Sequence, residues 1–325
     1  MLKTSDYILR GKPVRVRSVG ALSNPLSVLE ALGMVPDPWQ VEYLNSQSSI
    51  RILFSCRQAG KTEMTALGAV LACASAENVY SPIIAPSLRQ ASILARRAHQ
   101  IIRRIAETGR RLRAMPVPQA RYSPLHIVFE NGSRLQALPA SECAARGETA
   151  TGIVTIDEAS QVPDDVYAAV MPQRTMTMAP LCMLSTPWYQ DGRFFEMWTD
   201  SELADCERWR VIAPIEYARR RGVGIAGLET CGLPKDIAPD IEPYELTRMT
   251  YEGFCAATAG MTQEEIRREM YGIFSDNAGY AIFGASLIRD AITHDVKPLF
   301  ESPAGPEDEP EAEDVDRRIT PLFGM

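Results

Sequence analysis

The sequence predicts an α/β fold in which helices flank a mostly parallel β-sheet, with a small helical subdomain on its C-terminal side. Two observations favour this class. Short, continuously apolar runs recur along the chain, and segments with helical patterns separate them, as expected for strands covered on both faces. The run at residues 50–55 leads through a glycine-bearing turn into residues 63–76, which are rich in Ala, Leu and Met, so it indicates strand, loop and helix.

The following segments repeat this alternation. Residues 81–86 form a second apolar run, and Ser87 is a suitable N-cap for a long helix that we expect to reach residue 105. One face of that helix should be buried through its apolar positions, which are Ile93, Leu94, Ile101, Ile102 and Ile105. Residues 125–129 and 134–138 flank an Asn-Gly turn, which is typical of a hairpin at a sheet edge.

Two further runs end in polar side chains. Residues 152–156 precede Asp157 and Glu158, and residues 181–184 precede Ser185 and Thr186. Because ligands of parallel sheets bind at the carboxyl ends of the strands, this edge is the expected site. From about residue 209 Gly, Pro and mixed charges dominate, and residues 244–257 and 262–271 look helical.

These patterns predict four regions. We expect an N-terminal arm at residues 1–35, an α/β core at 36–208, a small helical or linker subdomain at 209–292 and an acidic, Pro-rich, disordered tail at 293–325. With 325 residues, of which 46% are hydrophobic, the chain can bury a sizeable core. A signal-peptide pattern and a membrane-length apolar run are both missing, so we expect a cytoplasmic protein without a membrane partner.

Charge is distributed unevenly along the chain. The net charge is −7, but residues 301–325 carry eight acids against two arginines, which leaves the body close to neutral. Residues 89–121 hold nine arginines against the single acid Glu107. Such a basic segment could contact the DNA backbone without sequence preference, or it could be a solvated helix face. The candidate DNA-contacting residues are Arg96, Arg97, Arg103 and Arg104.

The turn after the first apolar run carries an imperfect phosphate-binding motif. It spans Ser55, Cys56, Arg57, Gln58, Ala59, Gly60, Lys61 and Thr62, with serine where the motif usually begins with glycine. In such a loop the backbone N–H groups and the following helix N-terminus bind phosphates, the lysine reaches the outer phosphates, and the Thr hydroxyl binds Mg²⁺. The sequence therefore predicts a P-loop NTPase core, of the RecA or helicase-like kind, that uses ATP and Mg²⁺.

Asp157 and Glu158 complete the predicted site. Adjacent carboxylates at a strand end can divide the work: Asp157 would hold the Mg²⁺ coordination sphere, and Glu158 would orient and deprotonate the attacking water. Arg57 could stabilise charge on the γ-phosphoryl group, or it could pair with a neighbouring acid. Gln40 offers the donor and acceptor that an adenine edge requires. Ser185 and Thr186 could sense hydrolysis, or they could be a simple strand exit.

In this order, the elements resemble the ATPase domain of phage large terminase subunits, over residues 35–292. The resemblance rests on the stretches at residues 37–40, 55–62, 84–87, 146–147, 156–159, 185–187 and 267–274. It implies that Gln40 contacts adenine, that Arg57 acts in catalysis, and that Ser185 and Thr186 couple hydrolysis to DNA movement. It also implies double-stranded DNA, a portal protein and a small terminase subunit as partners, and assembly into a homo-oligomeric ring.

The chain departs from this family after residue 292. The family carries a metal-dependent nuclease domain there, whereas only an acidic, Pro-rich stretch follows in this sequence, so we expect no nuclease activity and a separate nuclease as a further partner. Two alternatives stay open: a helicase-like or remodelling DNA-dependent ATPase, and a non-catalytic DNA-binding remnant. A second RecA-like lobe would favour the former, and loss of hydrolysis the latter.

Overall fold

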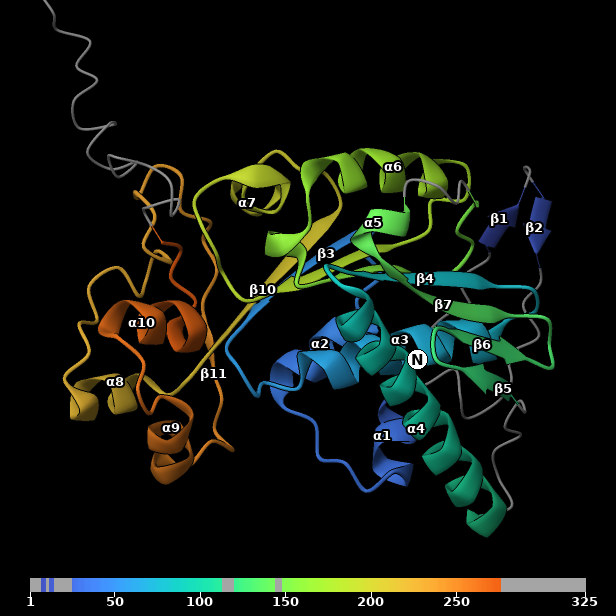
Figure 1. Cartoon of the computed structure of the whole chain (residues 1–325), viewed down its shortest axis with the longest axis horizontal. Helices are drawn as coiled ribbons and strands as arrows, with labels where there is room; N and C mark the ends of the chain where they lie inside the picture. The colour runs from blue at the N-terminus through green and yellow to red at the C-terminus, as the bar shows by residue number, and fades with distance from the viewer. Residues whose placement is uncertain (1–6, 10–11, 15–24, 113–119, 144–147, 276–325) are drawn as a thin grey trace, which may run out of the picture. The chain divides into compact units, whose positions relative to one another are not determined.

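A computed structural model of the chain describes residues 7–9, 12–14, 25–112, 120–143 and 148–275 (Figure 1). The chain divides into two units, residues 1–285 and 286–325, and everything described lies in the first. The predicted arm is therefore described only in part. The predicted acidic tail, together with Arg146 and Gly147, lies outside the described residues.

The centre of the fold is a nine-stranded sheet with the order β11-β10-β3-β9-β8-β4-β7-β6-β5. Neighbours from β11 to β7 pair in parallel, and β7, β6 and β5 pair antiparallel at one edge. The parallel strands are β3 (Ile50–Ser55), β4 (Tyr80–Ala85), β7 (Arg134–Pro139), β8 (Val154–Asp157), β9 (Leu181–Ser185), β10 (Cys206–Ile212) and β11 (Tyr244–Glu245). The antiparallel edge consists of β5 (Ala120–Ser123) and β6 (His126–Phe129), and β1 (Tyr7–Leu9) and β2 (Lys12–Val14) form a separate pair.

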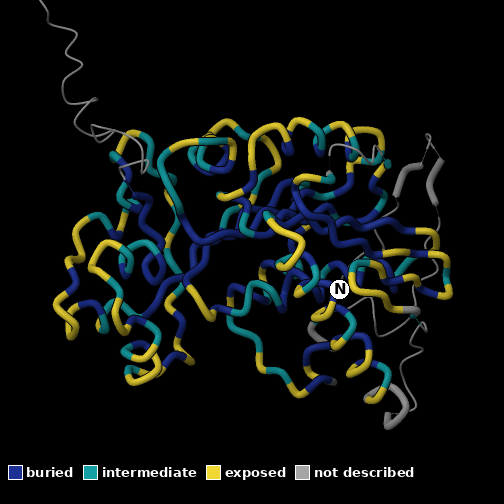
Figure 2. The backbone as a smooth tube through the Cα atoms, in the orientation of Figure 1, coloured by how far each residue is buried: buried dark blue, intermediate teal, exposed yellow. Residues whose placement is uncertain are grey.

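Helices cover both faces of the sheet (Figure 1). On one face lie α1 (Pro25–Ala31), α2 (Pro38–Asn45), α3 (Lys61–Ser75) and α4 (Leu88–Leu112); on the other lie α5 (Ala140–Cys143), α6 (Asp164–Thr175) and α7 (Gly192–Thr199). A hydrophobic core lies on each face of the sheet, and strand β3 contributes to both, because Leu53 points to one face while Ile52 and Phe54 point to the other. Burial on both faces explains why these strands read as continuously apolar, and Figure 2 shows them as the buried centre.

A group of shorter elements follows β10. It comprises α8 (Ile215–Arg221), α9 (Tyr251–Ala257) and α10 (Gln263–Tyr271). Helix α10 begins with a capping box between Thr262 and Glu265 and ends at Gly272, whose φ of 69° lies in the left-handed region. A Cβ at Gly272 would overlap the ring of Phe54 on β3. The end of α10 therefore packs directly against the strand that leads into the phosphate-binding loop.

Several sequence-based expectations need correction. Strand β10 crosses the expected boundary at residue 209 and pairs with β3, so the sheet continues into the region predicted to be helical. Residues 244–245 form a strand instead of beginning a helix. The edge strand β5 was not predicted, and α4 extends seven residues beyond Ile105. Ile93, predicted to be buried, is 47% exposed because it faces the pocket described below.

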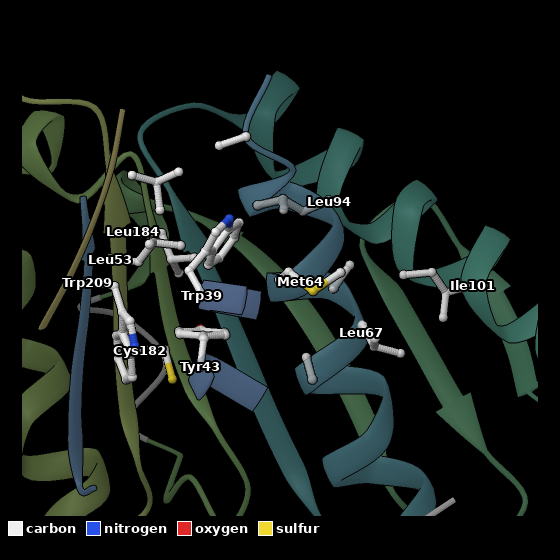
Figure 3. Packing of buried hydrophobic residues seen from close by; sticks show 14 of the residues in the cluster. Trp39, Tyr43, Leu53, Met64, Leu67, Leu94, Ile101, Cys182, Leu184 and Trp209 are labelled. Atoms are coloured by element: carbon white, nitrogen blue, oxygen red, sulfur yellow. The ribbon is translucent and has the colours of Figure 1, made fainter. Parts of the chain in front are cut away.

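Helix α2 is anchored between the sheet and α3 by its aromatic residues (Figure 3). Trp39 and Tyr43 are buried, and the ring of Tyr43 meets that of Trp209 edge-on with 5.4 Å between centroids. Met64 and Leu67 of α3 lie on the other side of these rings (Figure 3). Gln40 lies between Trp39 and Tyr43 in the sequence. Burial of these two large rings therefore keeps Gln40 close to the start of α3.

In the part of the chain that the structure describes, no helix combines the length and the apolar character needed to cross a membrane.

Candidate functional site

The loop between β3 and α3 has the backbone geometry of an anion site. Helix α3 starts at Lys61, so its free N–H groups and the positive end of its dipole face the loop. Gly60 precedes it with φ 88°, and a Cβ there would lie 2.9 Å from Arg248 Nη2 and 3.1 Å from Gln40 Nε2. Gln58 also has a positive φ, of 64°. The left-handed conformation favours glycine at position 60, and a Cβ there would require the ends of the Arg248 and Gln40 side chains to shift.

Lys61 and Glu158 face each other across this loop. Lys61 Nζ lies 2.7 Å from Glu158 Oε1, and the two side chains are 12% and 21% exposed. Glu158 follows β8 in a left-handed conformation with φ 49°, which is uncommon for a residue other than glycine. The fold thus brings the two residues on which the predicted chemistry depends into direct contact.

Asp157, at the end of β8, is buried, and its Oδ1 has no hydrogen-bond partner among the described residues. Burial raises the pKa of its carboxyl to about 6, although the nearby Lys61 acts in the opposite direction. A buried, unpartnered carboxylate oxygen fits a cation site. Among the described residues no group of three or more His, Cys, Asp or Glu side chains could hold a metal. One carboxylate and the Thr62 hydroxyl suit Mg²⁺, which takes its other ligands from phosphates and water.

Gln40 is buried and bound to the chain at both ends of its amide. Its Oε1 accepts from Asp37 N at 3.0 Å, and its Nε2 donates to Ala59 O at 3.4 Å. Arg248 joins the same group, because its guanidinium donates to Ala59 O and lies 3.2 Å from Asp37 Oδ2. The structure therefore places Gln40 beside the loop, where its amide ties α2 to Ala59. Its contact with adenine stays a prediction.

Arg57 is paired with an acid from α10. Its Nε lies 2.6 Å from Glu269 Oε2, and its backbone N–H donates to Glu269 O at 3.1 Å. The hydrogen bond to Glu269 raises the pKa of Arg57. Of the two interpretations of Arg57, pairing with an acid is the one that this structure contains. Its action on the γ-phosphoryl group stays a prediction.

Ser185 and Thr186 contact the turn after Glu158 through Ser160. Ser160 N donates to Ser185 Oγ at 3.2 Å, and the Ser160 hydroxyl donates to Thr186 O at 2.9 Å. The Oγ atoms of Ser160 and Ser185 are 2.6 Å apart. Because Ser160 gives its single proton to Thr186, the Ser185 hydroxyl supplies the proton of this contact. The end of β9 is thus bonded to the turn that carries the two carboxylates.

The arginines of α4 do not form one free basic face. Arg97 pairs with Glu63, the buried residue that follows Thr62 in α3. Arg104 lies 3.9 Å from Glu63 and donates to Leu32 O at 3.0 Å. Arg103 lies 3.9 Å from Glu107, one turn along the same helix. Contact of these residues with DNA stays a prediction.

A pocket of about 930 Å³ opens at the loop. From the predicted site it is lined by all seven loop residues from Cys56 to Thr62, together with Glu158 and Thr186. Arg96 and Arg97 of α4 line it too, so they face the loop's pocket. Gln40, Ser55, Asp157, Ser185, Arg103 and Arg104 are not part of its lining.

The sequence analysis assigned no role to three residues at the site, Ser160, Arg248 and Glu269, although Glu269 lies in the stretch 267–274 that carries the resemblance. Ser160 lies two positions after Glu158, so its place in the motif could have marked it. Arg248 and Glu269 come from segments 189 and 212 residues away from their partners in the loop. No local pattern reveals contacts of that separation.

Comparison with known proteins gives the following. The sequence matches the family model described as "Terminase large subunit, T4likevirus-type, N-terminal" over residues 52–287. The structure is similar to the large terminase ATPase domain of Thermus phage P74-26, with 21% identity and a TM-score of 0.54 over 76% of this chain and 97% of that one. It is also similar to the large terminase of bacteriophage HK97, with 17% identity and a TM-score of 0.51 over 74% of this chain. This chain spans 50% of the HK97 protein.

No curated protein matches the sequence. The structural similarities confirm the predicted α/β architecture, a mostly parallel sheet flanked by helices.

Proposed function

The chain belongs to the family of phage large terminase subunits, whose model covers residues 52–287, and we propose that it hydrolyses ATP to drive double-stranded DNA into a viral or prophage capsid. The observation that carries this proposal is the juxtaposition of Lys61 and Glu158, 2.7 Å apart at the mouth of the loop. Hydrolysis of a phosphoanhydride uses a lysine that binds the phosphate oxygens and a carboxylate that orients the attacking water, and the two groups must lie close together.

The loop and α3 bind the nucleotide's phosphates in this proposal. The N–H groups at the start of α3 supply fixed partial positive charge, and Lys61 adds a full charge at the outer phosphates. Lys61 then exchanges its present partner, Glu158, for phosphate oxygens. This exchange frees the Glu158 carboxylate when a triphosphate is bound, so that it can orient a water molecule and accept its proton.

Asp157 and Thr62 are the residues that would hold Mg²⁺. The bound ion would neutralise charge on the phosphate oxygens. Burial already prepares Asp157 for this role, since its unpartnered Oδ1 is costly to leave without a cation or a proton. The raised pKa of Asp157, to about 6, expresses that cost.

Ser185 and Thr186 would transmit the conformational change that follows hydrolysis to other parts of the chain. Both are buried, and through Ser160 they are bonded to the turn that holds Glu158. A movement of Glu158 on nucleotide binding or hydrolysis would therefore shift the end of β9. We propose this path as the coupling between the chemical step and the movement of DNA.

The further partners are proposed from the family. They are a portal protein, a small terminase subunit and additional copies of this chain in a ring, all acting in the cytoplasm of the bacterial host. That a separate chain supplies the nuclease stays a prediction. Arg96 and Arg97 line the loop's pocket, so in this proposal they lie beside the nucleotide, and contact of α4 with DNA stays a prediction.

ATP hydrolysis by the full chain with Mg²⁺, with and without double-stranded DNA, tests the proposal. We expect hydrolysis by the wild type, and a fall of about a hundredfold to ten-thousandfold in kcat for Glu158→Ala. Glu196→Gln, which changes an exposed acid on α7, is the matched control and should keep full activity. No hydrolysis by the wild type, alone or with portal and nuclease, would contradict the proposal and favour the non-catalytic remnant.

A further inference from the structure

The charges that line the loop's pocket do not balance. Its described lining contains four bases and three acids, and each acid is paired with one base. These pairs are Arg57 with Glu269, Lys61 with Glu158 and Arg97 with Glu63. The remaining base, Arg96, is exposed, and its side chain makes no hydrogen bond, ion pair or ring contact with any residue that the structure describes. Of the described bases in this pocket, Arg96 is thus the cation without an acid.

One face of α4 forms the wall of the pocket on which Arg96 lies. Its contributors are Gln90, Ile93, Arg96, Arg97 and Gln100. All but Arg96 recur at intervals of three or four residues, the spacing at which side chains share one face of an α-helix, and Arg96 is the direct neighbour of Arg97. The apolar face of α4 is buried in the core (Figure 3). The helix that carries Arg96 is therefore anchored along its other side.

Glu63 attaches this wall to the Mg²⁺ end of the proposed site. It directly follows Thr62, the residue proposed to hold Mg²⁺, and its buried carboxylate pairs with Arg97. Arg104, further along α4, lies 3.9 Å from the same carboxylate. In a bound triphosphate the β- and γ-phosphates share the metal ion. The wall that carries Arg96 is therefore held beside the position of the outer phosphates.

Arg96 differs from the other bases of the pocket in what a phosphate must displace. A phosphate that binds Lys61 or Arg57 has to replace a carboxylate, whereas at Arg96 it replaces water. The guanidinium presents a fork of N–H groups that matches two phosphate oxygens at once. Because Arg96 is exposed, this contact is weaker than a buried one, but it leaves no acid without its partner.

We propose that Arg96 is a nucleotide-binding residue, which bonds through its guanidinium to the terminal phosphate of a bound nucleoside triphosphate. The inference rests on the proposed function, since it requires that the pocket bind ATP. It gives Arg96 a role different from the contact with the DNA backbone that the sequence predicts for this residue. A diphosphate lacks the group that Arg96 binds, so Arg96 favours ATP over ADP.

Calorimetric titration of the full chain with ATPγS and with ADP, both with Mg²⁺, tests this inference. Arg96→Ala and Arg96→Gln both remove the charge, so they should weaken ATPγS binding by about threefold to thirtyfold and ADP binding by less than about twofold. The matched control is Arg89→Ala, because Arg89 is an exposed arginine of the same helix that is not among the residues lining the pocket. It should change neither affinity.

Binding of a short labelled DNA duplex, measured by fluorescence anisotropy without nucleotide, gives a second readout. If Arg96 serves the nucleotide, both Arg96 variants should bind the duplex within about twofold of the wild type. Their thermal unfolding should also match that of the wild type, because the Arg96 side chain contacts no described residue.

The outcomes separate the two proposals. Unchanged ATPγS affinity in both variants overturns the role of Arg96, and an equal loss for ADP and ATPγS overturns its assignment to the terminal phosphate. Loss of duplex affinity with both nucleotide affinities intact would place Arg96 on DNA instead. A lower unfolding temperature in both variants would make Arg96 structural and contradict the inference. Each of these results leaves the proposed function standing, whereas failure of the wild type to bind either nucleotide overturns both.

Discussion

The Oγ atoms of Ser160 and Ser185 lie 2.6 Å apart and join the turn after Glu158 to the end of β9. Ser185 is fully buried, so its hydroxyl depends on this partner. Through Ser160 this contact links the turn that follows Glu158 to Ser185, one of the two predicted coupling residues.

Replacing Ser160 by alanine removes this bond. We expect a loss of about 1–3 kcal/mol in the free energy of unfolding, because the proton of the buried Ser185 hydroxyl loses its acceptor and Thr186 O loses its donor, while the hydrogen bond from Ser160 N to Ser185 Oγ remains. Ser160 does not line the pocket, so KM for ATP should stay near the wild-type value while kcat falls. Urea unfolding and steady-state ATPase kinetics measure the two effects. Ser92→Ala, at a half-buried position of α4 whose hydroxyl donates within the helix to Leu88 O, is the control, and equal behaviour of the two variants would contradict the prediction.

Two glycines, one in the loop and one in α3, should respond in opposite directions to alanine. At Gly60 the positive φ and the nearby Arg248 and Gln40 both oppose a Cβ, so Gly60→Ala should destabilise the fold by about 1–3 kcal/mol and abolish nucleotide binding. At Gly68, inside α3, a Cβ would meet no atom within 4 Å. Gly68→Ala should therefore stabilise by about 0.5–1 kcal/mol through helix propensity.

Thermal unfolding monitored by circular dichroism distinguishes these two changes. The Gly68 variant is the control for the mere addition of a methyl group to this region. Equal stability of Gly60→Ala and the wild type would show that the loop conformation described here is wrong.

The central strands could be predicted from sequence, since burial on both faces leaves β3, β4, β8 and β9 mostly apolar. Strand β10 was missed for the opposite reason. Its sequence contains Glu207, Arg208 and Arg210, yet Arg210 is fully buried and its guanidinium donates to Tyr271 O. The acceptor of this buried arginine is Tyr271 O at the end of α10, and no pattern within β10 reveals a contact with that helix.

The candidate site divides in the same way. The residues from Ser55 to Thr62, with Asp157 and Glu158, could be predicted as a site because strand, loop and helix follow one another in sequence. The partner of Arg57 is Glu269 of α10, and Ala59 O accepts from Arg248, which follows β11. Folding decides which of the many acids and arginines of the chain reach the loop.

Cys56, inside the loop, should resist alkylation in the native protein. Its side chain is 1% exposed, and burial raises the pKa of its thiol to about 12, against the opposing effect of Lys61. A raised pKa means that the reactive thiolate is scarce throughout the range of pH 7 to 9 and increases only as the pH approaches 12. We expect iodoacetamide at pH 8.5 to modify Cys56 at least about tenfold more slowly than the half-buried Cys255.

Peptide mass spectrometry over time measures both rates in one sample. In urea the two cysteines should react alike, which controls for differences in peptide recovery. Equal native rates would mean that the loop opens far more often than its packing implies.

Arg248 provides the last prediction, because it bridges α2 and the loop. Its guanidinium contacts Asp37 Oδ2 at 3.2 Å and Ala59 O, and Asp37 is only 13% exposed. Arg248→Ala leaves this carboxylate without its cation and loosens Ala59, so we expect weaker binding of ADP and ATPγS alike, by about threefold to tenfold, with a loss of stability near 1 kcal/mol. Arg248→Lys should retain part of the affinity and part of the stability, because an ammonium can reach one acceptor but cannot bond to Asp37 and Ala59 at once as the guanidinium does.

The control is Arg219→Ala, at an exposed arginine of α8, which should change neither the affinity nor the stability. Calorimetry with both nucleotides distinguishes this residue from Arg57: a loss confined to ATPγS would place Arg248 at the γ-phosphate and contradict its assignment to the α2 side of the loop.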